Sequence, residues 1–324
     1  MSCLVNLALV ATSLCAATLL GSTAVQAQSP QEESSPTKYL RVSRDKDQKP
    51  EALETAVVSF SPKSGEKNVT VDLVSAIHIG DDVYFDALNR LFEDYDIVLY
   101  EMVKPKDVTP ARGFSDRQQT PLALVQRMLP SMLDLSFQVD SIDYTPKNFV
   151  HADLTPTELG EAMRKRGETG MSLFIKVVKE VMQQYQEEWA NGGSLSGNVS
   201  DAEILSFLTR KDGAQQLKAL IAGKLEELGP DMGLGATLDS ILIVDRNEAA
   251  LKVLKEQMAN RKNGKPLRIA VYYGAAHMPD MASRLTKDFQ MQQGDVSWVQ
   301  AWDITRASKK SALEGLLQLL QQPQ

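Results

Sequence analysis

The spacing of hydrophobic and polar residues in the first third of the chain predicts a strand hairpin followed by a helix. Residues 56–60 (AVVSF) and 69–74 (VTVDLV) are β-branched runs on either side of a glycine-containing turn, which is typical of a hairpin. Over residues 81–95, apolar side chains recur at steps of four, three and four, which predicts an amphipathic helix. Asp81 or Asp82 is the expected cap of that helix.

The pattern then passes through a long helical region and returns to strands. Residues 97–100 (IVLY) form a short apolar run, so strand, helix and strand make a βαβ unit. Residues 104–235 show mainly helical periods and predict a helical insertion that forms a cap or lid. Residues 267–273 (LRIAVYY) predict a buried strand followed by a helix to near residue 289, and 296–302 predict a last strand. The predicted fold is α/β, with a mixed central sheet built from two α/β halves and a large helical insertion.

One further helix is expected between the insertion and the strand at 267–273. Residues 241–244 (ILIV) suit either a buried strand or the start of a helix. Asp245 and Glu248 have the spacing of a capping box, which favours a helix that begins at that point.

The two ends of the chain fall outside this pattern. Residues 4–20 are apolar and uncharged and lead to small residues before Ala27, which predicts a signal peptide over 1–27 and an exported, periplasmic or extracellular protein. An uncleaved membrane anchor is the alternative, although the run is short for a bilayer span. The polar segment 28–50 predicts a disordered linker. Residues 305–324 predict an amphipathic helical tail, docked on the core or on a second copy in a homodimer.

Charge and cysteine content exclude several functions. The chain has 35 basic and 42 acidic residues, and this net charge of −7 argues against a nucleic-acid partner. Cys3 and Cys15 lie in the predicted signal peptide, so a cleaved chain has no disulfide, thiolate nucleophile or cysteine metal ligand. It also has no stable membrane span after cleavage. The sequence lacks a phosphate-binding glycine loop, a G-x-S-x-G elbow and an HExxH helix.

Two of the three histidines and one glutamate follow predicted strands directly. His78 comes just after the second strand of the hairpin, Glu101 after 97–100, and His277 after 267–273. Because ligands bind at the carboxyl ends of strands in open α/β sheets, these side chains are expected to converge. Two imidazoles and a carboxylate with an open position suit hydrolysis by metal-bound water. The alternative is two hydrogen-bonded structural histidines and a surface carboxylate.

Other polar residues near these positions are candidates for supporting roles. Gly274 would let the backbone approach a ligand closely. Arg246 would pair with Glu101 or stabilise a developing oxyanion, the alternative being an ordinary salt bridge at the start of a helix. His151 and Asp153 are candidates for an additional ligand or for an acceptor behind a ligand, with helix capping as the alternative.

These residues, in this order, resemble the TraB/PrgY/GumN family, which is related to the Tiki proteins. The resemblance covers roughly residues 68–103 and 238–302. The matching segments are 75–78 (SAIH), Glu101, 245–247 (DRN) and 274–277 (GAAH). The family motif Gly-x-x-His is intact at Gly274 and His277, whereas Ser75 occupies the glycine position of the first copy, beside His78.

The resemblance implies an α/β domain over 51–304 with a centre formed by His78, Glu101 and His277 and with Arg246 nearby. Tiki proteins are described as divalent-metal-dependent proteases, whereas the bacterial pheromone-shutdown member need not act by proteolysis. The leading hypothesis is an exported TraB-like metal-dependent hydrolase that uses manganese, cobalt or zinc, with a peptide or small molecule as substrate. In it, Glu101 takes a proton from water if it is not a ligand, and Arg246 stabilises the anion.

Two other functions remain open from the sequence. The same crevice would suit an envelope protein that sequesters a peptide, a small ligand or haem without turnover. A structural envelope protein that self-associates through the leucine-containing tail is the third hypothesis.

Overall fold

The computed structural model describes residues 38–65, 68–110, 131, 133–168, 210, 212–228, 243–261, 265–307, 311 and 314. All of them belong to one compact unit, Thr37–Gln324. The predicted signal peptide and most of the predicted tail lie outside the described residues, as do 111–130, 169–209 and 229–242 in the predicted insertion and after it.

Strands and helices alternate along this unit. Their order is β1 (Leu40–Arg44), β2 (Pro50–Pro62), β3 (Val69–Ala76), β4 (Ile79–Gly80), α1 (Asp82–Glu93), β5 (Ile97–Tyr100), β6 (Ser136–Phe137), α3 (Gln138–Ser141), β7 (Phe149–His151), α4 (Pro156–Lys165), α7 (Gly213–Leu228), α9 (Asp245–Ala259), β8 (Leu267–Gly274), the 3-10 helix η3 (Ala275–His277), α10 (Met278–Lys287) and β9 (Met291–Asp303). None of the helices in the described ranges is long and apolar enough to cross a membrane.

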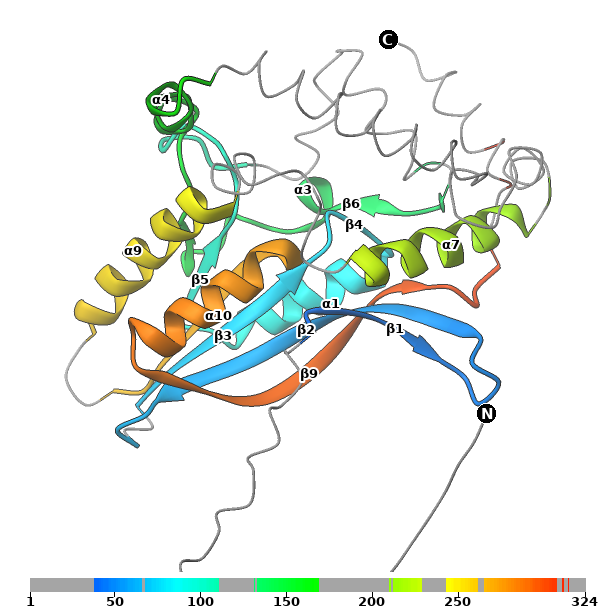
Figure 1. Ribbon diagram of the computed structural model, residues 1–324, viewed down its shortest axis with the longest axis horizontal. Helices are drawn as coiled ribbons and strands as arrows, with labels where there is room; N and C mark the ends of the chain where they lie inside the picture. The colour runs from blue at the N-terminus through cyan, green and yellow to red at the C-terminus, as the bar shows by residue number, and fades with distance from the viewer. Residues whose placement is uncertain are drawn as a thin grey trace, which may run out of the picture. The chain divides into compact units, whose positions relative to one another are not determined.

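The described strands form a mixed seven-stranded sheet, which confirms the predicted fold class (Figure 1). Its order is β1-β2-β3-β8-β5-β7, and β9 pairs with β2. The hairpin β2–β3 is antiparallel, as predicted, while β3, β8, β5 and β7 run parallel to one another. The carboxyl ends of those four parallel strands therefore lie along one edge of the sheet, where ligands bind in such folds.

Each face of the sheet carries its own apolar core because side chains alternate along a strand. Tyr272 on β8 faces a cluster that includes Tyr84 and Phe92 of α1. The next residue, Tyr273, faces the opposite cluster, which includes Leu254 of α9 and side chains of α10. Helix α1 thus covers one face, and α9 and α10 cover the other (Figure 1).

The predicted disordered linker 28–50 ends too late, because its last part is ordered in the structure. Its last part contains strand β1, which pairs antiparallel with β2. Val42 is buried, Arg41 forms an ion pair with Glu54, and Arg44 forms one with Glu226. The composition is polar because β1 borders the sheet and buries little, so its order comes from backbone pairing and ion pairs that composition does not reveal.

The predicted helical insertion 104–235 is not wholly helical. Its described residues include α4 and α7, but they also include β7, which extends the sheet beyond β5 in parallel register. A run of three residues is too short to show a period of two, so this strand leaves no pattern in the sequence.

Asp81 does not act as the predicted cap of α1. It occupies the N-cap position, but its side chain makes no capping hydrogen bond. Its carboxylate is buried and instead accepts from Lys218 Nζ at 3.3 Å, Arg306 Nη2 at 2.6 Å and the Asp303 backbone N–H at 2.6 Å. A buried ion pair that joins α1, α7 and the end of β9 has replaced a local helix cap.

The capping box predicted at Asp245 and Glu248 is also absent. Val244 is already helical and takes the N-cap position of α9 without a side-chain cap. Asp245 accepts two hydrogen bonds from Arg166, and Glu248 pairs with Arg284. Both carboxylates thus bind side chains from other helices or loops in place of their own helix terminus.

Tyr272 supplies a test of how the α1 face is stabilised. Its hydroxyl is the only buried side-chain polar atom of the described residues that lacks a hydrogen-bond partner. We expect Tyr272→Phe to raise the free energy of unfolding by about 1 kcal/mol, because it removes an uncompensated desolvation cost. The matched variant Tyr95→Phe should lower it by about 2 kcal/mol, because the Tyr95 hydroxyl donates to buried Asp72 at 2.7 Å. Urea unfolding of both variants measures these changes in the free energy of unfolding. Equal decreases in the two variants would contradict the prediction.

Candidate functional site

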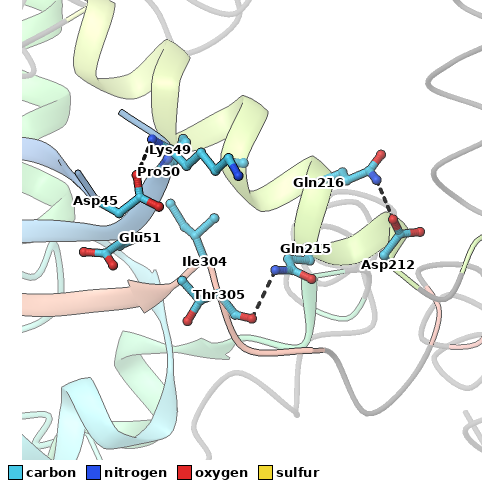
Figure 2. A pocket seen from close by; sticks show the side chains of 10 residues that line it. Asp45, Lys49, Pro50, Glu51, Asp212, Gln215, Gln216, Ile304 and Thr305 are labelled. Carbon is cyan, nitrogen blue, oxygen red and sulfur yellow. Dashed lines mark hydrogen bonds between the residues drawn. The ribbon is translucent and has the colours of Figure 1, made fainter. Parts of the chain in front are cut away.

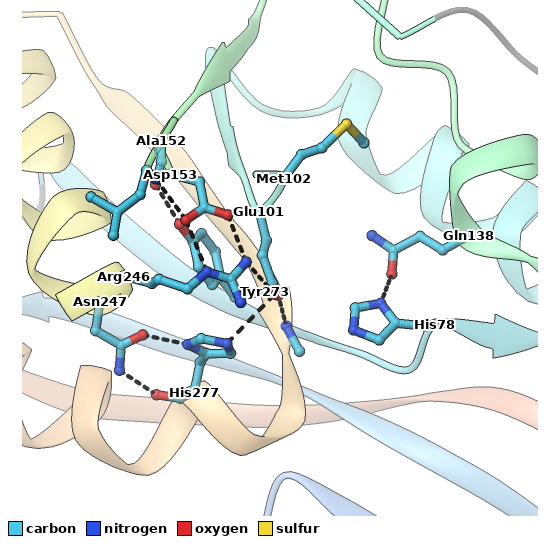
Figure 3. Close-up of polar contacts among 12 residues, drawn as sticks. His78, Glu101, Met102, Gln138, Ala152, Asp153, Arg246, Asn247, Tyr273 and His277 are labelled. Atoms are coloured by element: carbon cyan, nitrogen blue, oxygen red, sulfur yellow. Dashed lines mark hydrogen bonds and ion pairs between the residues drawn. The ribbon is translucent and has the colours of Figure 1, made fainter. Parts of the chain in front are cut away.

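Most of the predicted site residues come together at the carboxyl edge of the sheet, where Figure 3 shows Glu101, Arg246, His277 and His78. Glu101 directly follows β5, and Gly274 ends β8 beside it. His277 lies in the 3-10 helix that follows β8, and Arg246 lies in the first turn of α9. His78 follows β3, the strand on the other side of β8. The parallel register of β3, β8 and β5 therefore brings together residues that are far apart in the sequence.

Glu101 is the centre of the site. Its side chain is 8% exposed, its Oε1 accepts from Arg246 Nη2 at 2.7 Å, and its Oε2 accepts from the Gly274 backbone N–H at 2.7 Å. The Nε2 of His277 lies 3.5 Å from Oε1. Burial alone would raise the pKa of Glu101, but His277 and His78 in their protonated forms, together with Arg246, outweigh burial and hold the pKa well below its ordinary range. Glu101 is therefore ionised near neutral pH.

Arg246 joins two buried carboxylates. Besides Glu101, it binds Asp153 through Nε at 3.0 Å and Nη2 at 2.6 Å. The Asp153 side chain is fully buried, and its segment is tied to β8 by a hydrogen bond from the Tyr273 hydroxyl to the Ala152 carbonyl. The predicted pairing of Arg246 with Glu101 is confirmed, and Asp153 acts as the acceptor that holds this guanidinium. Two carboxylates and one guanidinium leave this group with a net charge of −1.

His277 is fixed by Asn247, a residue of the matching segment 245–247 to which the sequence analysis gave no role of its own. The His277 ring is buried, and its Nδ1 lies 2.7 Å from Asn247 Oδ1. The Asn247 amide nitrogen donates to the His277 carbonyl at 3.1 Å and to Asp280 at 2.9 Å. The sequence offered one indication of this contact: Asn247 follows Arg246 directly, and both lie in the first turn of α9.

His78 is more exposed and is held from a different part of the chain. Its Nδ1 lies 3.0 Å from Gln138 Oε1, and its carbonyl accepts from the Gln138 backbone N–H at 2.8 Å. The Gln138 amide nitrogen donates to the Tyr144 hydroxyl at 3.1 Å. The hydrophobic pattern around Gln138 does not place it in a helix or strand. Its contact with His78 therefore could not be predicted from the sequence.

Gly274 is the point at which these side chains meet. A Cβ at this position would lie 3.4 Å from Glu101 Oε2, 3.7 Å from His277 Cδ2 and 3.9 Å from His78 Nε2. The absence of a side chain thus leaves room between the carboxylate and both imidazoles. Ser75 is placed differently: Ala76, not Ser75, is the register partner of Gly274, and the Ser75 hydroxyl donates to the Tyr39 carbonyl at 2.9 Å.

His151 does not join this group through any contact found in the described residues. Its Nε2 donates to the Met102 carbonyl, 2.7 Å away. Burial lowers its pKa. Together with Asp153 it lines a neighbouring pocket of about 640 Å³ between α4 and α9.

A second pocket, of about 390 Å³, shares no lining residue with the site (Figure 2). Asp45, Lys49, Asp212 and Thr305 are among the residues that line it. Its polar groups already bind one another, since Gln215 donates to the Thr305 carbonyl and Gln216 donates to Asp212. We assign no function to it.

Within the part of the chain that the structure describes, no group of three or more histidine, cysteine, aspartate or glutamate side chains is arranged to hold a metal ion. The chain matches no family model, no curated protein and no solved structure. The resemblance to the TraB/PrgY/GumN family therefore stays a prediction.

Removing Arg246 tests the charge balance of the site. We expect Arg246→Met to lower the free energy of unfolding at pH 7 by about 3 kcal/mol, because two buried carboxylates lose their cation. In the parent, the lowered pKa of Glu101 contributes stability above the ordinary glutamate pKa of about 4.3, and acid removes it. In the variant, the pKa of Glu101 rises and acid relieves the repulsion, so the difference from the parent should shrink toward pH 4.5.

Urea unfolding at pH 7 and pH 4.5 measures both effects. Arg284→Met is the matched control, because the partners of Arg284 are more exposed and its loss should cost less than about 1 kcal/mol. An Arg246→Met deficit that stays constant or grows toward pH 4.5 would contradict the assigned charge balance.

Proposed function

We propose that this protein is an exported, TraB-like metal-dependent hydrolase whose site is formed by His78, Glu101 and His277. One observation carries the proposal: a buried carboxylate and two imidazoles meet around the open side of Gly274 at the carboxyl edge of a parallel sheet. Export rests on the predicted signal peptide over residues 1–27. The substrate class, a peptide or a small molecule with a hydrolysable carbonyl bond, rests on the family resemblance.

The side-chain types at this sheet edge suit a divalent ion, although in the arrangement that the structure describes they do not form a ligand group. Imidazole nitrogens and a carboxylate are the ligands that zinc, cobalt and manganese sites use. The Glu101–Arg246–Asp153 group has a net charge of −1, which favours a cation beside it. Asn247 Oδ1 accepts from His277 Nδ1, so in the neutral ring Nε2 has a lone pair and faces Glu101 Oε1 at 3.5 Å. In that neutral form two acceptors face each other, and either a proton on Nε2 or a bound metal cation would relieve their repulsion.

Each residue of the site would have a separate role. His78, Glu101 and His277 would hold manganese, cobalt or zinc, which when bound acts as a Lewis acid and lowers the pKa of water. If Glu101 is not itself a ligand, this carboxylate, ionised by its surroundings, is the group able to accept a proton from water. Arg246, held by Asp153, keeps the Glu101 carboxylate in one orientation and balances its charge. His78 is the exposed member and marks the side from which a substrate approaches.

One observation favours a second function, that of a binding protein without turnover. Arg246 already gives Nε and Nη2 to Asp153 and Glu101, so these donors are not directed at an oxyanion. A protein that sequesters a peptide or small ligand in the same crevice would not require that role. Metal dependence separates the two functions.

Metal analysis of the protein purified without chelator tests the proposal. We expect nearly one manganese, cobalt or zinc ion per chain, lost in His78→Ala and in His277→Ala. His151→Ala is the matched control and should keep the ion, because His151 binds the Met102 carbonyl outside the site. Hydrolysis of a peptide library should follow the metal content. An ion-free parent after soaking with all three metals would overturn the proposal and favour the binding protein.

Gly274→Ala tests the site without removing any ligand. The backbone angles of Gly274, φ −54° and ψ 146°, suit alanine, and the new methyl group would meet its neighbours at ordinary contact distances. We therefore expect unchanged stability but loss of metal binding and of hydrolysis, because the methyl group fills the space between the three side chains. Thermal unfolding and titration calorimetry measure the two properties. Metal affinity equal to that of the parent would place the ion elsewhere.

A further inference from the structure

We propose that Asn247 is a positioning residue that keeps the hydrogen of His277 on Nδ1 and so withholds it from Glu101. The geometry assigns this role independently of any metal. Its consequence for metal affinity rests on the proposed function above.

The orientation of the Asn247 amide is fixed by two acceptors that cannot donate. The amide nitrogen lies 3.1 Å from the His277 carbonyl and 2.9 Å from Asp280 Oδ2. A carbonyl and a carboxylate only accept, so the NH₂ group must face them and Oδ1 must face His277. Because an amide oxygen only accepts, Nδ1 of His277, 2.7 Å away, must carry the hydrogen.

This arrangement opposes the pairing that His277 would otherwise form. Its Nε2 lies 3.5 Å from Glu101 Oε1, a strong anionic acceptor. Without Asn247, the tautomer with hydrogen on Nε2 would donate to Glu101, and Nε2 would have no lone pair for a ligand. Asn247 therefore stabilises the Nδ1–H tautomer, which cannot donate to Glu101. The same tautomer is the one that a metal ligand at Nε2 requires.

Asp280 supports Asn247 from behind. Its carboxylate accepts from the Asn247 amide and from Arg284 Nε at 2.8 Å. Glu248 also binds Arg284, at 3.3 Å, but no hydrogen bond joins it to Asn247 in the described structure. Asp280 and Glu248 are therefore a matched pair in which only the first orients the amide.

His78 does not allow the same deduction. Its partner Gln138 is oriented by the Tyr144 hydroxyl, which can donate or accept, so either amide orientation is satisfied. His151 has the opposite assignment from His277, because its Nε2 faces the Met102 carbonyl and must donate. The chain thus contains an internal reference for the other tautomer.

Nitrogen-15 NMR of the metal-free, full-length protein with labelled histidine tests the assignment. The sequence has only three histidines, so substitution of each identifies its signals. Spectra are recorded at rising pH until all three rings are neutral. We expect His277 with hydrogen on Nδ1 and His151 with hydrogen on Nε2. His277 with hydrogen on Nε2 in the parent overturns the proposal, whatever the metal analysis shows.

Variants then separate positioning from folding. Asn247→Ala and the milder Asp280→Ala should move His277 toward the Nε2–H tautomer while His151 stays unchanged, and Glu248→Ala should leave both unchanged. Manganese or zinc affinity, measured by calorimetry, should fall about 10-fold to 100-fold in Asn247→Ala. A His277 tautomer that Asn247→Ala leaves unchanged in a folded protein would contradict the role. A parent that binds no metal refutes the proposed function, and the NMR result still decides this inference.

Discussion

The contact of Arg246 with two buried carboxylates is the interaction on which the site depends. Glu101 follows β5 and Asp153 follows β7, so these two strand ends would present repelling charges at a dry sheet edge without a cation. Arg246 can reach both only if α9 begins directly above them. The ion triad therefore holds the first turn of α9 at this edge, and the same turn of helix places Asn247 against His277. Fold and site are thus coupled through one guanidinium group.

The strands and helices with strong periodicity could be predicted from the sequence. So could the sheet edge at which the site residues lie together. The runs at 69–74, 97–100 and 267–273 became β3, β5 and β8, and their parallel order placed His78, Glu101 and His277 on one edge. Convergence could be predicted because it follows from strand direction alone. Side-chain partners could not, because they depend on which surfaces pack together.

Particular residues show what local pattern leaves out. Asp81 stands where a helix cap is expected, yet buried Lys218 outcompetes the helix terminus for its carboxylate, from 137 positions away in the chain. Strand β7 has three residues and needs β5 beside it to be a strand at all. Gln138 reaches His78 because β6 pairs with β4, a ladder of two residues that no period can reveal. In each case the deciding contact joins segments that the sequence does not mark as neighbours.

The two imidazoles differ in how firmly they are held, and this difference gives the site a direction. His277 is buried, and its amide partner is anchored by a carbonyl and a carboxylate that leave it one orientation. His78 is exposed, and its amide partner depends on a hydroxyl that accepts either orientation. Glu101 and His277 therefore form the rigid part of the site, held by the core. His78 can change its tautomer without moving either of them. The exposed imidazole thus lies on the outer side of this sheet edge, and the preorganised carboxylate and the buried imidazole lie behind it.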